Sequence, residues 1–229
     1  MPEVTFPAAA ESEELDLLRR RVVNVVGHEL RTPVTTLRGL AEQLVQAPDE
    51  ESRRPLLDAL VRSAVRLEQL VDDLLLASGI FTASPAGDPA DVDLAAAVRR
   101  AGWDGPVQGE AVARAIPEAV DRVLAPIVDN ARRHGDPVEV RIEAHGDQVV
   151  VDVESGGPVI DAGDAALLCE PFFRGEAAVM TAPGLGLGLA VARTVARYQG
   201  GDVHAHPRAG GGLVVRVELP RREAGSDRQ

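Results

Sequence analysis

The residues with the clearest chemical potential surround His28, in the sequence HELRTP at positions 28–33. A neutral imidazole is a competent nucleophile, and its pKa lies near physiological pH. Glu29 can accept a proton or orient the ring, and Thr32 lies about one helical turn further along on the same side. Pro33 lacks a backbone donor and crowds the carbonyl of Glu29, so we expect the helix to loosen or kink there. These residues predict a nucleophilic histidine presented from a helix.

A second group of residues is suited to phosphates. Asn130 precedes two arginines at the end of a predicted helix, where its carboxamide oxygen can ligate Mg²⁺ and the arginines can face phosphates. The glycine-rich stretch 184–188 opens another helix, so its backbone can approach a phosphate beside free N-terminal donors. Each pattern alone also fits an ordinary helix end or turn, because basic residues suit helix C-termini and turns use glycine.

The elements that carry the histidine are two long helices. Leucines and valines at spacings of three and four predict one helix over 13–46 and a second over 52–78. Pro48 and the acidic run 49–51 interrupt the pattern between them. Two such helices form an antiparallel hairpin whose apolar stripe has nothing opposite it. Self-association into a four-helix bundle would bury that stripe.

The second half of the chain mixes helical and strand patterns, after a segment at 81–92 that is rich in glycine, proline and small residues. We expect helices at 93–101, 117–134 and from the glycine-rich stretch to about 198. Strands are expected at 138–144, 148–154, 202–206 and 213–219, and weakly at 106–114. This order predicts an α/β domain in which helices cover a mixed or antiparallel sheet.

Composition narrows the functional classes. The 229 residues carry 24 basic and 36 acidic side chains, a formal net charge of −12, which disfavours a general nucleic-acid binder. Every one of these 24 basic side chains is an arginine, and the sequence contains no lysine. A Walker-type phosphate loop and Schiff-base chemistry both need a lysine, so both are excluded. Cys169 is the single cysteine, which excludes a disulfide framework and fits a reducing compartment. No apolar run reaches the length of a membrane span.

The string at 28–33 resembles the phospho-acceptor box of bacterial sensor histidine kinases, and the hairpin resembles their dimerisation and histidine-phosphotransfer domain. The resemblance implies that His28 is phosphorylated on a ring nitrogen and that Glu29 is its acid–base partner. Thr32 would position water when the phosphoaspartate of a response regulator is hydrolysed.

The second half resembles the Bergerat-type ATP-binding α/β sandwich that histidine kinases share with Hsp90-type chaperones and type II topoisomerases. The resemblance makes Asn130 the Mg²⁺ ligand, Arg133 a phosphate-facing residue and 174–183 a short lid over ATP. The remaining matches fall on two boxes of that family: Phe172, Phe173 and Arg174 on the F box, and Gly184, Gly186 and Gly188 on the second glycine box.

The chain departs from that pattern where the family binds adenine. Its first glycine box reads Asp-x-Gly-x-Gly, but the matching stretch 155–160 has Ser155 in place of the Asp. Gly157 is retained, and Val159 replaces the second glycine. Glu154 is one position away, so on a strand it would point to the opposite face. We therefore expect weakened or altered purine recognition.

A second departure lies on the helix of Asn130. The family has another Asn four residues earlier, where this chain has Pro126, and we expect the proline to break the helix at that turn.

The resulting hypothesis divides the chain into a disordered lead-in (1–12), a dimerisation and phosphotransfer domain (13–80), a hinge linker (81–92), an ATP-binding domain (93–220) and a disordered tail (221–229). The expected partners are a second copy and a response-regulator receiver, with ATP and Mg²⁺ as cofactors and no nucleic acid. The chain is expected in the cytoplasm, either alone or as the cytoplasmic part of a membrane sensor whose N-terminal region is missing here.

Three alternatives remain open at this point. The ATP-binding domain could be degenerate, which would leave a histidine relay or phosphatase protein with weak or no nucleotide binding. A different ATPase of the same superfamily is disfavoured by the HELRTP string on a helical hairpin. A purely structural coiled coil does not explain the glycine-rich stretch.

Overall fold

The computed structural model describes residues 8–47, 49–77, 87–175 and 185–222, without the side chains of 8–25, 28 and 77. The chain divides into two compact units, Met1–Asp72 and Asp73–Gln229. A helical hairpin followed by an α/β sandwich with a mixed sheet confirms the predicted fold class. Among the described residues, no helix combines the length and apolarity needed to cross a bilayer.

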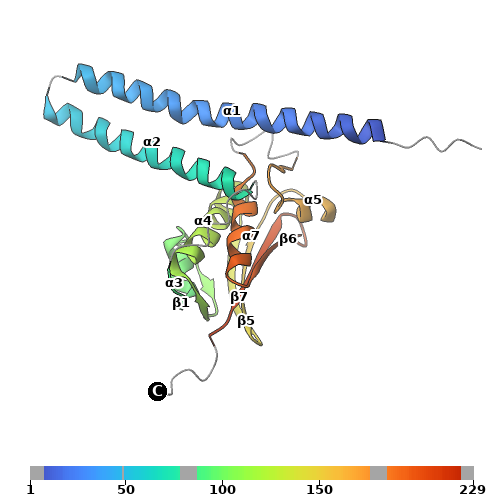
Figure 1. The fold of residues 1–229 in the computed structure, drawn as a ribbon. Helices are drawn as coiled ribbons and strands as arrows, with labels where there is room; N and C mark the ends of the chain where they lie inside the picture. Colours follow the sequence, from blue (N-terminus) through green and yellow to red (C-terminus); the bar gives the residue numbers. More distant parts are fainter. Residues whose placement is uncertain (1–7, 48, 78–86, 176–184, 223–229) are drawn as a thin grey trace, which may run out of the picture. The chain divides into compact units, whose positions relative to one another are not determined.

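The first unit is built from α1 (Ala8–Gln46) and α2 (Glu50–Ala77), which run antiparallel (Figure 1). The Ser52 amide donates to Asp49 Oδ1 over 2.8 Å, so Asp49 caps the start of α2. That hydrogen bond from the Ser52 backbone holds the pKa of Asp49 below its ordinary value. The acidic run expected to end the first helix therefore also starts the second.

Pro33 lies inside α1, which continues through it as one helix. A proline interrupts a helix by removing one hydrogen bond and crowding one carbonyl. Here Thr36 Oγ1 donates to the Thr32 carbonyl over 3.0 Å, so the turn that contains Pro33 is spanned by a side-chain bond. The loosening expected beside His28 does not interrupt the helix.

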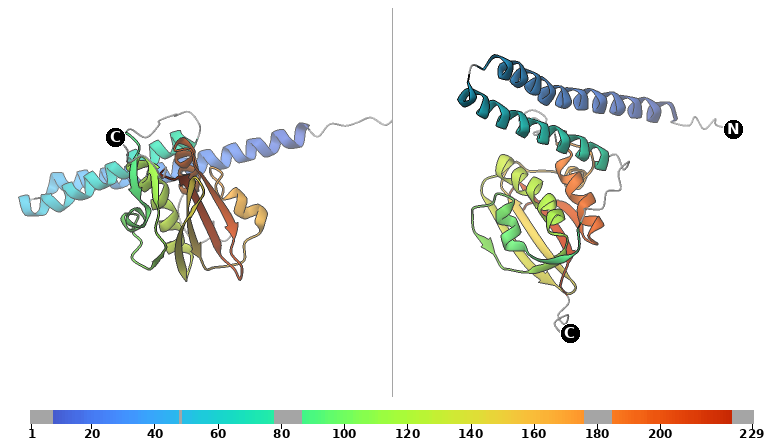
Figure 2. Two further views of the ribbon diagram at one scale, coloured as in Figure 1. Left: turned by 90° about the horizontal axis from the view of Figure 1, so that it is seen from below. Right: turned by 60° about the vertical axis from the view of Figure 1, so that its left-hand side comes forward.

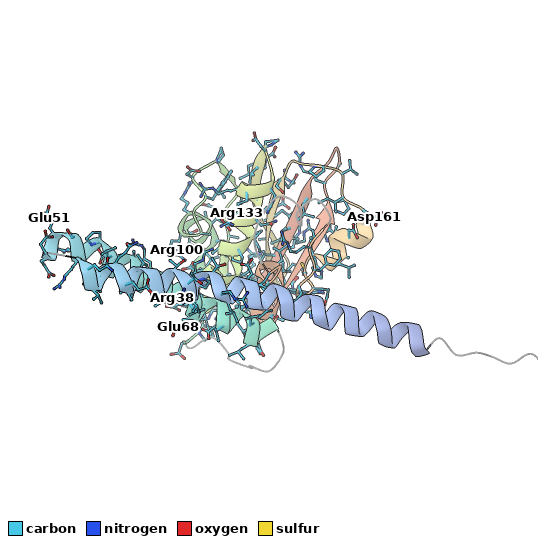
Figure 3. All side chains as sticks on the ribbon, turned by 90° about the horizontal axis from the view of Figure 1, so that it is seen from above. Arg38, Glu51, Glu68, Arg100, Arg133 and Asp161 are labelled. Atoms are coloured by element: carbon cyan, nitrogen blue, oxygen red, sulfur yellow. The ribbon has the colours of Figure 1, made fainter. Side chains whose placement is uncertain are left out.

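The hairpin leaves large apolar side chains uncovered in the single chain. Val45 on α1 is 84% exposed, and Val61 on α2 is 58% exposed. Leu57 and Val65 lie one turn to either side of Val61 and are also exposed, so the three form a stripe along α2. Charged side chains such as Arg38, Glu51 and Glu68 project from the same two helices (Figure 3).

The second unit contains a two-stranded sheet and a five-stranded sheet. The small sheet pairs β1 (Ala90–Asp93) with β3 (Val112–Ala115), antiparallel. The large sheet has the order β2-β4-β5-β7-β6, with β2 parallel to β4 and all other neighbours antiparallel. Its strands are β2 (Val107–Gln108), β4 (Val138–His145), β5 (Gln148–Ser155), β6 (Asp202–Pro207) and β7 (Leu213–Pro220).

Helices cover one face of the large sheet (Figure 2). The other face carries charged side chains, among them Asp152, Glu154 and Arg216. The covering helices are α4 (Pro117–His134) and α7 (Gly188–Tyr198). Helix α3 (Leu94–Arg100) packs against α4 and β1, and α5 (Ala162–Leu167) lies beside the edge strand β6. The alternation along β5 places Val151 and Val153 in the core against α4, with Ser155 on the same face. Asp152 and Glu154 face the other way.

Several elements differ from the sequence-based expectations. Helix α4 runs from Pro117 to His134 as predicted, but the break expected at Pro126 is wrong. Pro126 is half-buried, and Leu124 and Ile127 on either side of it are fully buried. We attribute the continuity of the helix to the packing of this apolar face, which offsets one missing hydrogen bond. The weak strand expected at 106–114 is two short strands in different sheets. Strand β1 begins at Ala90, within the range expected for the linker, and α5 was not predicted.

Candidate functional site

The predicted phospho-acceptor residues lie on α1 in the first unit. His28 is inside the helix, and its side chain falls outside the described part of the structure. Glu29 is half-buried and Thr32 is exposed, one turn apart on the helix. The helix presents this segment on a regular backbone, which the uninterrupted course of α1 through Pro33 preserves.

Asn130 and Arg133 lie on the last turns of α4. Asn130 is half-buried and sits one turn after Pro126, so both residues share one face of the helix. Arg133, labelled in Figure 3, is exposed. It donates to the Asp129 carboxylate over 2.9 Å. An exposed pair at this spacing contributes only about 0.3–0.5 kcal/mol, so Arg133 can exchange it for a phosphate at little cost.

The glycine-rich stretch leads directly into α7. Gly184 lies outside the described residues, Gly186 has a φ of +68°, and Gly188 is the first residue of the helix. The N-cap, Leu187, supplies no side-chain hydrogen bond, so the first amides of α7 have no capping partner from that residue. An uncapped helix N-terminus behind a glycine turn is suited to an anion.

Gly186 brings the F-box turn against this loop. A Cβ added at Gly186 would lie 2.6 Å from the Phe173 carbonyl oxygen and 2.9 Å from Arg174 Cγ, so only glycine fits there. Phe172 has a φ of +65°, a conformation that costs a bulky residue roughly 1–3 kcal/mol and persists only when its surroundings fix it. The structure therefore places Phe173 and Arg174 next to the start of α7.

Gly188 brings α7 against α4. A Cβ added at Gly188 would lie 3.1 Å from Pro126 Cβ, which is tighter than ordinary packing. Asn130 is one turn beyond Pro126 on the same face, so it lies on the side of α4 that faces α7. Pro126, which replaces an asparagine of the family, therefore packs between α4 and α7.

Ser155 and Gly157 lie at the end of β5, against the end of α4. Ser155 is 6% exposed, and its hydroxyl donates to the Leu213 carbonyl over 3.4 Å. A Cβ at Gly135 would overlap Ser155 Cβ, and the Gly156 amide donates to the Pro137 carbonyl over 2.8 Å. This part of the site therefore presents a neutral hydroxyl that the sheet already uses.

The nearby carboxylates cannot take the place of Ser155. Asp152 accepts two hydrogen bonds from Arg216, both of 2.8 Å, on the opposite face of the sheet. Glu154 lies on that same face, 3.4 Å from Arg208 and 3.5 Å from Arg141. The strand position of Glu154 predicted this orientation, and its ion pairs hold it there.

Sequence reasoning missed two contributions to this region. The Gly212 amide donates to the Pro158 carbonyl over 2.9 Å, so the turn between β6 and β7 supports the loop after Ser155. Three consecutive glycines at 210–212 were the available signal. The second is an ion pair between Glu170 and Arg193, 23 residues apart, which carries no local sequence signal.

The donor set around Asn130 fits a magnesium ion that arrives with a nucleotide. Among the described residues, no group of three or more His, Cys, Asp or Glu side chains could hold a metal ion. Mg²⁺ is commonly bound through one or two protein oxygens together with substrate phosphates and water. Asn130 could supply one such oxygen, and the phosphates would then supply further ligands.

Two family profiles match the chain. Residues 18–80 match the "His Kinase A (phospho-acceptor) domain", and residues 115–223 match the "Histidine kinase-, DNA gyrase B-, and HSP90-like ATPase". Together they include His28, Asn130 and all the glycine-box residues discussed above.

Sensor proteins with 31–36% identity match over most of the chain. It is 36% identical over 240 residues to the sensor protein SphS of Synechococcus elongatus, covering 92% of this chain and 57% of SphS. It is 34% identical to the sensor protein CutS of Streptomyces coelicolor, covering 88% and 53%, and 31% identical to the sensor histidine kinase MtrB of Mycobacterium tuberculosis, covering 96% and 42%. The chain thus spans about half the length of the curated relatives it matches.

Solved structures share the fold. The histidine kinase AdeS of Acinetobacter baumannii aligns with a TM-score of 0.57 at 21% identity, over 86% of this chain and 98% of that one. Full-length ShkA in complex with AMPPNP aligns with a TM-score of 0.58 at 22% identity, over 90% of this chain and 46% of that one.

Proposed function

The chain belongs to the sensor histidine kinases, with a HisKA phospho-acceptor domain and a HATPase_c ATP-binding domain, and on that premise we propose that it autophosphorylates on His28 with ATP. We further propose that it passes the phosphoryl group to an aspartate of a response-regulator receiver.

One observation carries this proposal: the uncapped start of α7, the Phe173–Arg174 turn and Asn130 converge beside α4. Backbone amides, arginine and a carboxamide oxygen are the groups that neutralise and orient a triphosphate. The same chain presents the HELRTP string on a helix. A phosphate-binding site and a nucleophilic histidine are the two components that phosphoryl transfer to histidine requires.

In the proposed reaction, a ring nitrogen of His28 attacks the γ-phosphorus of ATP. The bond from that phosphorus to the β,γ-bridging oxygen breaks, and ADP leaves with the electron pair. Glu29 accepts the proton from the other ring nitrogen as the phosphoramidate forms. Mg²⁺ held between Asn130 and the phosphates would neutralise charge on the departing diphosphate. The aspartate of the receiver then attacks the same phosphorus, and His28 is regenerated.

The hairpin is proposed to act as a dimer. The exposed stripe of Leu57, Val61 and Val65 is apolar surface that a second copy of α1 and α2 can cover in a four-helix bundle. Val45 on α1 is also exposed in the single chain, so both helices carry uncovered apolar side chains. A homodimer of hairpins is the simplest arrangement that removes this surface from water.

The division of labour between the units is part of the proposal. The phosphotransfer domain corresponds to 13–80 and the ATP-binding domain to 93–220. Transfer requires that the nucleotide reach His28, so the linker expected at 81–92 would act as a hinge, shortened by the strand that begins at Ala90. We propose a cytoplasmic location for this catalytic core, alone or as part of a membrane sensor.

Purine recognition is proposed to be weaker than a carboxylate would provide. A hydrogen bond to a charged acceptor contributes roughly 1.5–3 kcal/mol, so its loss weakens binding by about one to two decades. Ser155 offers a hydroxyl that must leave the Leu213 carbonyl or accept with its lone pairs. The phosphate side of the site has no comparable loss.

Two further functions are less directly supported. Thr32 is exposed one turn from Glu29, where it could orient water to hydrolyse the phosphoaspartate of the receiver, giving phosphatase activity. The replacement by Ser155 also favours an alternative, a relay or phosphatase protein that binds nucleotide weakly or not at all.

Incubation of the full chain with γ-labelled Mg-ATP tests the proposal. We expect an acid-labile label on the wild type, none on His28→Ala, and normal labelling of His145→Ala, a matched control at an exposed histidine. Label on His28→Ala, or a wild type that neither binds ATP nor becomes labelled, would refute autophosphorylation at His28. The second result, with phosphotransfer from a phosphorylated receiver intact, would favour the relay alternative.

A further inference from the structure

Arg193 on α7 bridges two carboxylates that come from different elements. Its Nη1 donates to Glu170 Oε1 over 3.2 Å, and its Nε donates to Asp202 Oδ1 over 3.1 Å. The Arg193 side chain is only 21% exposed, and that of Asp202 is 23% exposed. Arg193 therefore ties the end of the α5 segment to the first residue of β6 through helix α7.

The Asp202 end of this bridge is firmly held. Arg197 donates twice to Asp202, both over 3.1 Å, and the Val203 amide donates over 2.7 Å. Burial raises the pKa of Asp202, but the hydrogen bonds from the two arginines and this amide outweigh it, so the pKa lies below its ordinary value. Asp202 is thus an ionised anchor that fixes the Arg193 guanidinium.

The Glu170 end leads into the F-box turn. Cys169 is buried, so the chain leaves the core at this point. The Phe173 amide donates to the Glu170 carbonyl over 3.3 Å, which encloses the left-handed Phe172 in a short turn. A residue in that conformation needs surroundings that fix it. The Glu170 side chain supplies a fixed point at the beginning of the turn.

The Phe172–Arg174 turn packs against the loop before α7. Gly186 lies against the Phe173 carbonyl and the Arg174 side chain, and two residues later α7 begins. Arg193 is on that same helix. The contacts therefore close a circuit from Arg193 to Glu170, along the turn to Gly186, and back along α7 to Arg193. The start of α7 and the Phe173–Arg174 turn, both proposed above to face the phosphates, lie on this circuit.

We propose that Glu170 and Arg193 are positioning residues of the nucleotide site, whose ion pair holds the Phe172–Arg174 turn against Gly186 and so sets the affinity for the nucleotide phosphates. The inference rests on the proposed function, because the site must bind ATP for its affinity to change. Neither residue touches the phosphates in this role; they act through the turn.

Glu170→Gln is the most informative variant, since it keeps the shape of the side chain and removes only its charge. Glu170 is half-exposed, and exposed ion pairs are individually weak, so we expect the KM for Mg-ATP to rise about two- to fivefold. The kcat for autophosphorylation should change by less than about twofold, because the transferred group and His28 are untouched. Displacement of a fluorescent ATP analogue from the full chain gives the matching affinity.

Arg197→Gln is the matched control. Arg197 also binds Asp202 but forms no described contact with Glu170, and without it Asp202 keeps its bonds from Arg193 and from the Val203 amide. Loss of Arg197 should therefore lower the melting temperature without changing the KM for Mg-ATP. Arg193→Gln should raise the KM at least as much as Glu170→Gln. Arg193→Lys should restore part of the affinity, because lysine keeps the charge but not the forked geometry. The double variant should be no worse than Arg193→Gln alone.

The outcomes separate this inference from the function on which it rests. A wild type that binds and uses ATP, with a Glu170→Gln variant of unchanged KM, would overturn the positioning role alone. Equal KM changes in Glu170→Gln and Arg197→Gln would also overturn it, because they would indicate a general loss of stability. A wild type that binds no ATP would overturn both.

Discussion

The two units of this molecule differ in how they bury their apolar side chains. The hairpin carries His28, the proposed phospho-acceptor, on a regular helix and leaves apolar side chains such as Val61 exposed. The second unit buries a full core between its sheet and helices, and the glycines at its site allow the backbone segments to touch. In the proposed function the hairpin therefore relies on a second copy to cover its apolar stripe, whereas the proposed nucleotide site is assembled within one chain.

Because of this difference, substitutions that impair association should be distinct from substitutions that impair nucleotide use. Damage to the apolar stripe should affect association and leave nucleotide binding intact. Damage beside α4 and α7 should affect nucleotide use and leave association intact. Substitutions in each unit test that independence.

Asn130→Ala should produce the largest effect. Removal of the carboxamide oxygen proposed to hold Mg²⁺ against the phosphates should lower the autophosphorylation rate roughly a hundredfold to a thousandfold. The helix itself should remain stable, because alanine is the best helix former. Single-turnover labelling measures the rate, and analytical ultracentrifugation should give an unchanged dimer. A variant with a nearly normal rate would remove Asn130 from the site.

Val61→Glu should have the next largest effect, on the other unit. A charge placed in the proposed dimer interface has no partner there, so the dimer dissociation constant should rise about a hundredfold. Affinity for Mg-ATP should not change. Arg62→Glu is the control, because Arg62 lies on the polar stripe with Asp58 and Arg66 and should leave the dimer intact. Equal dimer loss in both variants would place the interface elsewhere.

Ser155→Asp should strengthen binding. A carboxylate at the end of β5 would accept from the adenine amino group, so affinity for ATP should rise by about one decade while affinity for GTP stays the same or falls. Calorimetry with ATP and with GTP measures the ratio of the two affinities. Ser155→Ala serves as the neutral control. The buried hydroxyl site is crowded by Gly135, so a melting curve must accompany the titration. An unchanged ratio of ATP to GTP affinity would mean that the base does not contact this position.

The smallest expected effect concerns Cys169, whose thiol should react very slowly in the native chain. Burial raises the pKa of the Cys169 thiol to about 11. At pH 8 the thiolate is then about one part in a thousand, so iodoacetamide should label the native chain hardly at all and label it readily in denaturant. Because the unfolded thiol loses its proton near pH 9 and the native one near 11, this group lowers stability as pH rises through that window. Fast labelling of the native chain would contradict the burial.

The sequence predicted the elements whose signals are local. Pro117 and the charged end before Gly135 marked both ends of α4, and alternation along β4 and β5 marked that hairpin. The opposite orientations of Ser155 and Glu154 followed from strand periodicity alone.

The errors arose where tertiary contacts decide the outcome. Pro126 was expected to break α4, but buried neighbours on both sides and a contact with Gly188 keep the helix whole. Helix α5 and strand β1 are only six and four residues long, too short for a periodic pattern. The pairing of Glu170 with Arg193 spans 23 residues and is set by packing, so no sequence window contains it.

The central claim is that phosphates held beside α4 reach an imidazole on α1. Peptide mapping by mass spectrometry under neutral conditions, after incubation of the full chain with Mg-ATP, tests it most directly. We predict one phosphoryl group per chain, confined to the peptide that contains His28 and absent from Asn130→Ala. Phosphorylation at another residue, or undiminished phosphorylation of Asn130→Ala, would contradict it.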